Sequence, residues 1–171
     1  MTRCVYIANE TVSLVDYQEC DNRALYENEL DPDTQKGYNN GYVSTFEEFV
    51  KEEITQRFFA MILLNATQEI IGAVGISPLD MIADLAIWMF KPYRRHGYGT
   101  SAFALLTKYA TDTLHITDLH AGVYPDNIGS WKMLEKCGYV PCPASTAKNE
   151  PEKHFLTDEE LYQLDYVSAH D

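Results

Sequence analysis

Three nearly continuous apolar runs occupy the middle of the chain. They cover Phe58–Leu64, Ile70–Ile76 and Leu79–Phe90, and the polar segment Asn65–Gln68 joins the first two. Runs of this length and composition predict strands, and a four-residue polar connection predicts a hairpin. Because neither face of these strands is polar, we expect central strands that are covered on both sides.

The spacing of apolar residues then changes to that of helices. Thr100–Leu114 repeats apolar residues every three to four positions, which predicts a helix. Ile116–Val123 alternates apolar with polar or small residues, as a strand does. A second helix is predicted over Asn127–Cys137, with Asn127 as its N-cap and Gly138 as its C-terminal stop.

The two ends of the chain are more mixed. Near the N-terminus we expect a strand at Glu10–Val15 and a helix at Gln18–Asn28 that Asp31–Asp33, with its central proline, brings to an end. A short acidic helix is predicted over Thr45–Ile54, and a last apolar run covers Leu161–Val167. The order of strands and helices predicts an α/β or α+β sandwich.

Composition excludes several classes of protein. The 171 residues fit a single domain spanning residues 1–171. With 26 acidic and 13 basic residues the formal charge is -13, which argues against a nucleic-acid-coating surface. No apolar run approaches the roughly 20 residues that span a bilayer, and the N-terminus has no signal-peptide pattern. We therefore expect a soluble, cytoplasmic protein that binds neither nucleic acid nor membrane.

The four cysteines do not form a metal-ligand pattern. Cys137 and Cys142 have four residues between them, but no second pair or nearby histidine cluster completes a zinc site. We expect reduced thiols and no metal.

The segment Arg94–Thr100 is basic, contains two glycines and lies between a predicted strand and a predicted helix. Glycines allow a tight turn that exposes successive N–H groups, and the helix N-terminus behind it adds unpaired N–H groups. The pattern favours a diphosphate site, although neither a dinucleotide fingerprint nor a Walker loop matches. The alternative is a basic turn before a surface helix.

A second motif, Tyr124–Tyr139, stands at the exit of the next strand. Arg-x-x-Gly-x-Gly at Arg94–Gly99, followed about 28 residues later by Asn-x-x-Ser and then Lys-x-Gly-Tyr, resembles the GNAT superfamily of N-acetyltransferases. The resemblance is closest to the ribosomal-protein-alanine acetyltransferase-like (RimJ/RimL-type) branch. In that branch a strand reading roughly Ala-Glu-Ile-Gly-Tyr-Trp precedes the loop, and Ala83–Trp88 is similar to it. The strong match covers Ile82–Tyr139.

This resemblance implies a mixed central sheet of about six to seven strands, flanked by about four helices, in which two strands splay apart in a V. It also implies that the pantetheine arm of acetyl-CoA threads the gap and pairs with the main chain of Asp84–Phe90. The loop would hold the diphosphate, largely through backbone N–H groups. Carried over by position, the cofactor contacts fall at Trp88, Met89, Arg94, Arg95, His96, Gly97, Tyr98, Gly99, Thr100, Asn127 and Ser130.

The implied activity is transfer of an acetyl group from acetyl-CoA to a primary amine, by direct attack in a ternary complex and without a metal. Many family members have a tyrosine that protonates the departing thiolate where this chain has Leu134, so Ser130 is our candidate donor. The candidate bases are Asp84, by its position, then His120 on the adjacent strand and Tyr124 at that strand's exit. Each also has a purely structural interpretation.

We expect the amine acceptor to bind between Gln18 and Ile54 and the segment after Tyr139. Acidic and aromatic residues there suit a small cationic amine or a protein N-terminus, although a solvated acidic helix face is the simpler interpretation. A non-catalytic acyl-CoA-binding protein and a nucleotide-binding module are alternatives, and a monomer or homodimer is expected. The acidic and aromatic residues of the expected acceptor site are Tyr26, Tyr38, Tyr42, Phe46, Glu27, Glu29, Asp31, Asp33, Glu47 and Glu48.

Overall fold

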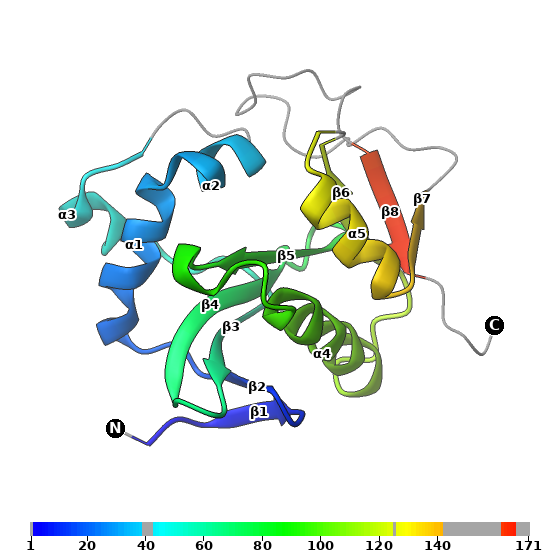
Figure 1. Ribbon diagram of the computed structural model, residues 1–171, viewed down its shortest axis with the longest axis horizontal. Helices are drawn as coiled ribbons and strands as arrows, with labels where there is room; N and C mark the ends of the chain where they lie inside the picture. The colour runs from blue at the N-terminus through cyan, green and yellow to red at the C-terminus, as the bar shows by residue number, and fades with distance from the viewer. Residues whose placement is uncertain (1, 39–42, 125, 142–161, 167–171) are drawn as a thin grey trace.

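One mixed sheet of eight strands forms the centre of the computed structural model, which describes residues 2–38, 43–124, 126–141 and 162–166 (Figure 1). Within this part of the chain, neighbouring strands are antiparallel except for the parallel pair β5–β6. The order across the sheet is β1-β2-β3-β4-β5-β6-β8-β7. The strands are β1 (Val5–Ala8), β2 (Val12–Val15), β3 (Phe58–Leu64), β4 (Glu69–Ile76), β5 (Ala83–Met89), β6 (Leu119–Val123), β7 (Tyr139–Pro141) and β8 (Tyr162–Tyr166).

Helices cover both faces of this sheet. Figure 1 shows α1, α2 and α3 grouped on one side of β4 and β5, with α4 and α5 on the other. Adjacent residues of β3 belong to two separate hydrophobic clusters. Ile62 is in the cluster that includes Phe103 of α4, whereas Met61 is in the cluster against which Leu25 of α1 packs. The prediction of central strands covered on both sides is confirmed. The helices are α1 (Asn22–Leu30), α2 (Pro32–Gly37), α3 (Phe46–Phe49), α4 (Tyr98–Asp112) and α5 (Ile128–Lys136).

The described residues hold slightly more elements than the sequence predicted, with eight strands rather than six to seven and five helices rather than four. The sequence missed β1 and β7. β1 is a four-residue edge strand with the apolar sequence Val-Tyr-Ile-Ala, and β7 has only three residues, so each run is too short to identify a strand by its spacing. Both exist because a neighbouring strand offers hydrogen-bonding partners.

Two predictions for the N-terminal helices were wrong in detail. Pro32 was expected only to stop a helix, but it is also the first residue of α2, where a missing N–H costs nothing. Asp31 caps that helix by accepting a 3.1 Å hydrogen bond from the Thr34 N–H. The third helix was expected to reach Ile54 but α3 ends at Phe49.

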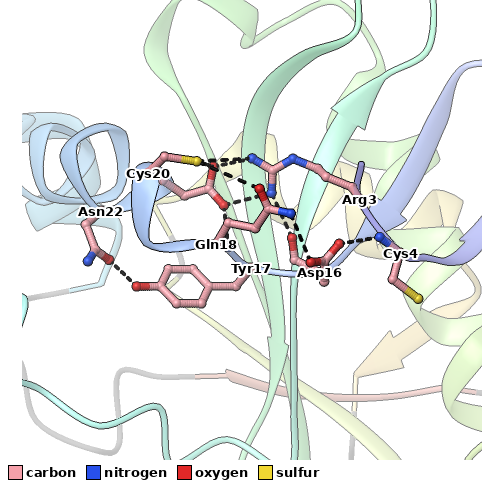
Figure 2. A network of polar contacts seen from close by, with 8 residues as sticks. Arg3, Cys4, Asp16, Tyr17, Gln18, Cys20 and Asn22 are labelled. Carbon is pink, nitrogen blue, oxygen red and sulfur yellow. Dashed lines mark hydrogen bonds and ion pairs between the residues drawn. The ribbon is translucent and has the colours of Figure 1, made fainter. Parts of the chain in front are cut away.

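A largely buried ion pair ties the N-terminus to the start of α1. Arg3 donates to both carboxylate oxygens of Asp21 at 2.6 and 2.9 Å, and to the carbonyl of Asp16 at 2.8 Å. The side chain of Asp21 is only 5% exposed. In the same network, the Tyr17 hydroxyl donates to the side chain of Asn22 (Figure 2). The first turn of α1 is therefore held to the end of β2.

The parallel strands β5 and β6 pair only where they begin. Their register consists of Ala83 with Leu119 and Asp84 with His120. β5 continues to Met89 and β6 to Val123, in parts of the chain that the structure describes completely, without further pairs between them. This divergence is the V-shaped splay that the family resemblance implied.

Close contact between β4 and β5 yields a testable prediction. A Cβ atom at Gly72 would lie 2.3 Å from the Trp88 carbonyl oxygen and 3.2 Å from the Met89 Cα. Because backbone must move to accept it, we expect Gly72→Ala to lower the free energy of unfolding by about 1–3 kcal/mol in urea denaturation.

The matched control is Gly129→Ala in α5, where no atom lies within 4 Å of the added Cβ. Alanine is the better helix former by about 1 kcal/mol, so this variant should be as stable as the parent or more so. Equal stability of both variants would contradict the tight packing of β4 on β5.

Candidate active site

A cavity of about 450 Å³ occupies the splay between β5 and β6. Residues 84–88 of β5 line one wall, and residues 121–124, at the end of β6 and just beyond it, line the other. The structure therefore brings together the strand and the second motif that the sequence analysis singled out. From α5 the lining residues are Ser130, Met133 and Leu134, together with Asn127 just before this helix.

Alternate main-chain groups of β5 face this cleft. The carbonyl of Ile87 accepts a hydrogen bond from the Tyr38 hydroxyl, and that of Met89 accepts one from the Arg94 Nε at 2.8 Å. Both carbonyls therefore point away from β4. Since the N–H and C=O of one strand residue point the same way, the N–H of Ile87 also faces the cleft. It is suitably placed to donate to a ligand that lies along β5.

The glycine loop leads from β5 into α4 with two residues in left-handed conformation. They are Arg95, with φ of 64°, and Gly97, with φ of 81°. Gly97, the N-cap of α4, makes no side-chain hydrogen bond to the first turn, and helix N-termini have N–H groups that can bind an anion. A Cβ at Gly99 would lie 3.3 Å from the Met89 side chain, which explains the second glycine. The exposed guanidinium of Arg95 adds positive charge, and the exposed side chain of His96 follows it in the loop.

Arg94 points from this loop towards the N-terminal helices. Its guanidinium donates to Asp31 at 2.7 Å, to Thr34 at 2.8 Å and to Asn28 at 3.2 Å, besides the bond to Met89. The structure thus shows Arg94 linking the loop to α1 and α2. A direct contact between Arg94 and a cofactor stays a prediction.

Charge and hydrogen bonding shift the acidity of Asp31. Burial alone would raise the pKa of this carboxyl, but hydrogen bonds from Arg94 and the Thr34 backbone hold the pKa below its ordinary value. The charge of Arg94 acts in the same direction. Asp31 is therefore ionised at neutral pH and is occupied as a structural partner, not as part of an open acidic surface.

Two of the candidate bases are direct neighbours across the sheet. Asp84 lines the cleft and pairs in register with His120, whose Nδ1 lies 2.6 Å from Asp165 Oδ1 on β8. The three side chains form a row across β5, β6 and β8. His120 itself is not among the described residues that line the cleft. The sequence analysis missed Asp165, because only the pairing of the C-terminal strand brings it to His120.

The α5 wall offers a hydroxyl but no tyrosine. Ser130 and Leu134 lie one turn apart and both line the cleft, and Leu134 is 2% exposed within the core. The Asn127 side chain accepts a 3.2 Å hydrogen bond from the Ser130 N–H, which confirms its predicted role as N-cap. Tyr124, 4% exposed, also lines this wall.

The end of α2 contacts both β5 and the segment just before α5. Tyr38 bonds to Ile87 on β5 and stacks on Trp88, with 5.6 Å between ring centroids. Two residues earlier, Lys36 pairs with Asp126 at 3.3 Å. Burial raises the pKa of Tyr38 well above its ordinary value, so its hydroxyl stays protonated. The sequence singled out Tyr38 only as one of several aromatic residues.

A second cavity of about 220 Å³ lies beside the first, between the N-terminal helices and β3 and β5. The two cavities share Tyr38, Gln56 and Trp88. Of the predicted acceptor residues, Glu29 and Tyr38 line it. Glu48 instead caps α3 with Thr45, and Tyr42 and residues 142–161 lie outside the described part of the chain.

Two searches of the described residues complete the description of the site. No group of three or more histidine, cysteine, aspartate or glutamate side chains in them is arranged to hold a metal ion. In the same residues, no helix combines the length and the apolar character needed to cross a membrane.

The sequence and the fold were compared with those of known proteins. Residues 12–140 match the family model described as the acetyltransferase (GNAT) domain, and no curated protein sequence gives a significant match. Among solved structures, an acetyltransferase from Agrobacterium tumefaciens superposes with a TM-score of 0.77 at 21% identity, covering 98% of this chain and 95% of that one.

Two further structures are similar in fold. RimL, a ribosomal L7/L12 α-N-protein acetyltransferase in complex with coenzyme A, has a TM-score of 0.74 at 14% identity and covers 98% of this chain and 99% of its own. A spermidine N-acetyltransferase chimera from Vibrio cholerae and hSSAT has a TM-score of 0.72 at 13% identity, with 92% and 96% covered.

The Arg94–Asp31 contact can be tested through pH. Asparagine caps a helix as well as aspartate, so Asp31→Asn removes the ion pair but keeps the cap. We expect a loss of about 1–3 kcal/mol in the free energy of unfolding at pH 7. Because the pKa of Asp31 is lowered in the folded protein, this contribution is present above the ordinary aspartate pKa and disappears as pH falls through the folded value.

Asp33→Asn is the control, since that side chain is 77% exposed and 3.9 Å from Arg94. It should change stability by less than about 0.5 kcal/mol at neutral and at acidic pH. A loss for Asp31→Asn that does not become smaller as the pH is lowered would show that the ion pair is not its cause.

Proposed function

The chain belongs to the GNAT family of acetyltransferases, and from this premise we propose that it transfers the acetyl group of acetyl-CoA to a primary amine. The observation that carries the proposal is the cavity of the β5–β6 splay, which has main-chain groups of β5 along one wall. Beyond the cavity, β5 is followed by the glycine loop and by the N-terminus of α4, which has no side-chain cap. A ligand with a peptide-like arm and a diphosphate has the matching chemistry.

Residues of the loop would hold the diphosphate. The N–H groups of the first turn of α4 and the positive charge of Arg95 provide the anion site, and Gly97 and Gly99 allow its shape. The arm would lie along the free edge of β5, past Met89 and Trp88. Asn127 and Ser130 would meet its far end from α5. When bound, acetyl-CoA supplies the thioester from which the acetyl group is taken.

Asp84 is the proposed general base. An alkylammonium is mostly protonated at neutral pH, so a side chain must accept its proton before the nitrogen can attack a carbonyl. Asp84 lines the cleft on β5, three residues from the Ile87 N–H that would polarise the acetyl carbonyl. The alternative bases are His120, which is paired with Asp165, and Tyr124. Both lie on or just beyond β6, the strand next to Asp84.

Ser130 is the proposed hydroxyl donor to the departing sulfur. It lies on the cleft-facing side of α5, one turn before the buried Leu134, whose side chain has no proton to give. Direct transfer is favoured over an acyl-cysteine route. Burial raises the pKa of Cys137 to about 11, so this thiol stays neutral and is a poor nucleophile at pH 7.

The acceptor is proposed to be a small cationic amine or a protein N-terminus. Proteins of similar fold include a spermidine N-acetyltransferase and a ribosomal α-N-protein acetyltransferase. The alternative function is a non-catalytic acyl-CoA-binding protein. It is favoured by Leu134, which stands where many family members have the tyrosine that protonates the departing thiolate. We further propose a single GNAT domain, monomeric or homodimeric, that acts in the cytoplasm.

Mass spectrometry tests the function directly. The purified chain is incubated with acetyl-CoA and a panel of primary amines, and we expect a gain of one acetyl group on at least one amine. Binding of CoA with no acetylated product would support the non-catalytic alternative. ATP at equal concentration should not displace CoA, and displacement would favour a general nucleotide-binding module.

Asp84→Asn should separate catalysis from binding. Removal of a general base typically costs 10²–10⁴-fold in rate, so we expect a fall in kcat of about that size with an unchanged Kd for CoA. Steady-state kinetics and calorimetry measure the two quantities. Asp80→Asn, an exposed carboxylate in the turn before β5, is the control and should behave as the parent. An unchanged kcat for Asp84→Asn would remove Asp84 from the mechanism.

A further inference from the structure

We infer that the 220 Å³ cavity is the acceptor pocket, and that it takes a small aliphatic amine bearing a second positive charge rather than a protein N-terminus. The inference rests on the proposed function, since it assigns the acceptor of the same reaction. Three independent features of the cavity carry it: its position, its charge and its aromatic walls.

The pocket opens onto the cleft beside the reacting position. Tyr38, Gln56 and Trp88 line both cavities, so they form the boundary between them. Trp88 follows Ile87, whose main chain faces the cleft. An amine held in the pocket with one nitrogen directed past Trp88 would therefore reach the point where the arm along β5 ends.

The charged groups of the pocket are all carboxylates. Glu29 of α1 faces Glu52 and Glu53 of the segment after α3, and none of the described lining residues is basic. The nearby guanidinium of Arg94 is paired with Asp31 at 2.7 Å. Three carboxylates around one small cavity exceed the single charge of a monoamine or of a protein N-terminus. They favour a ligand with a second ammonium group.

The acidity of Glu29 supports this assignment. Burial, and then the negative charge of Glu52, raise the pKa of Glu29 above its ordinary value. A cation beside Glu29 would offset both effects, because it favours the ionised form of this carboxyl. The ammonium group that does not react would occupy this position.

Aromatic rings form the remaining walls. Phe59 lies between Tyr17 and Trp88, with ring centroids 6.2 and 6.1 Å away, and Trp88 stacks on Tyr38. Ring faces attract alkylammonium groups and pack against the methylene chain between two of them. Tyr17 is held by its bond to Asn22 in the network of Figure 2, so this wall is positioned before a ligand arrives.

The size of the cavity also selects a small molecule. Its volume is about 220 Å³. A chain of four or five carbons with an ammonium at each end fits such a space. The side chains of a protein terminus would have to remain outside, where they gain nothing from the three carboxylates.

The test compares 1,4-diaminobutane with 1-aminobutane and with a short peptide that has a free N-terminus, each as acceptor for acetyl-CoA. We expect kcat/KM for the diamine to exceed that for either other amine by at least 10-fold. Glu29→Gln should lower kcat/KM for the diamine about 10-fold, mainly by raising KM, and should change the values for 1-aminobutane less than 2-fold.

Glu19→Gln is the matched control, because Glu19 is an exposed carboxylate just before α1 that does not line the pocket. It should leave all three acceptors unaffected. Equal use of the three amines, preference for the peptide, or a Glu29→Gln variant that matches the parent would each overturn the inference while leaving acetyl transfer intact.

A binding measurement keeps this inference separate from the proposed function. Calorimetry with 1,4-diaminobutane in the absence of acetyl-CoA should show binding to the parent and at least 10-fold weaker binding to Glu29→Gln. If no amine is acetylated, the proposed function fails, and this measurement still decides whether the pocket recognises a diamine. Equal affinity of the parent and the variant would overturn the pocket assignment.

Discussion

The early divergence of β5 from β6 is the constraint on which the candidate site depends. Two parallel strands that pair at only two positions leave main-chain N–H and C=O groups inside the protein without a neighbouring strand. Buried main-chain groups require partners. The Tyr38 hydroxyl donates a hydrogen bond to the carbonyl of Ile87, and the Arg94 Nε donates one to the carbonyl of Met89. The N–H of Ile87 faces the cavity. The site is therefore a gap in a sheet whose edge is completed partly by side chains and, as we propose, partly by a ligand.

These two edge contacts also join the halves of the site. Arg94 leaves the glycine loop for Asp31 and Asn28, and Tyr38 leaves α2 for β5, so the N-terminal helices are attached both to the loop and to the cleft. The loop also borders the second cavity, because Asn28 and Thr34, which bond to Arg94, line that cavity. Within an overall charge of -13, the exposed Arg95 lies in the loop and three carboxylates line the second cavity.

Much of the fold could be predicted because its signals are local. The central strands and the helix of α4 follow from apolar spacing, and the cap at Asn127 follows from a single residue at a helix start. Errors arose where a local signal has two meanings. Pro32 ends one helix and begins another, since a residue without an N–H suits both positions. The apolar run of β1 is only four residues long, and this strand forms by pairing with the edge of β2.

Some features of the candidate site could likewise be predicted from local sequence signals, and others could not. By itself the sequence determined the glycine loop before a helix, the strand that leads into it, and the absence of a hydroxyl at Leu134, because each depends on residue types at short spacing. Only the tertiary structure decided that Arg94 turns to Asp31, that Asp165 reaches His120, and that Glu29 shares a cavity with Glu52. These pairs lie between 23 and 63 residues apart. Their meeting depends on how the strands and helices pack, and no local periodicity encodes it.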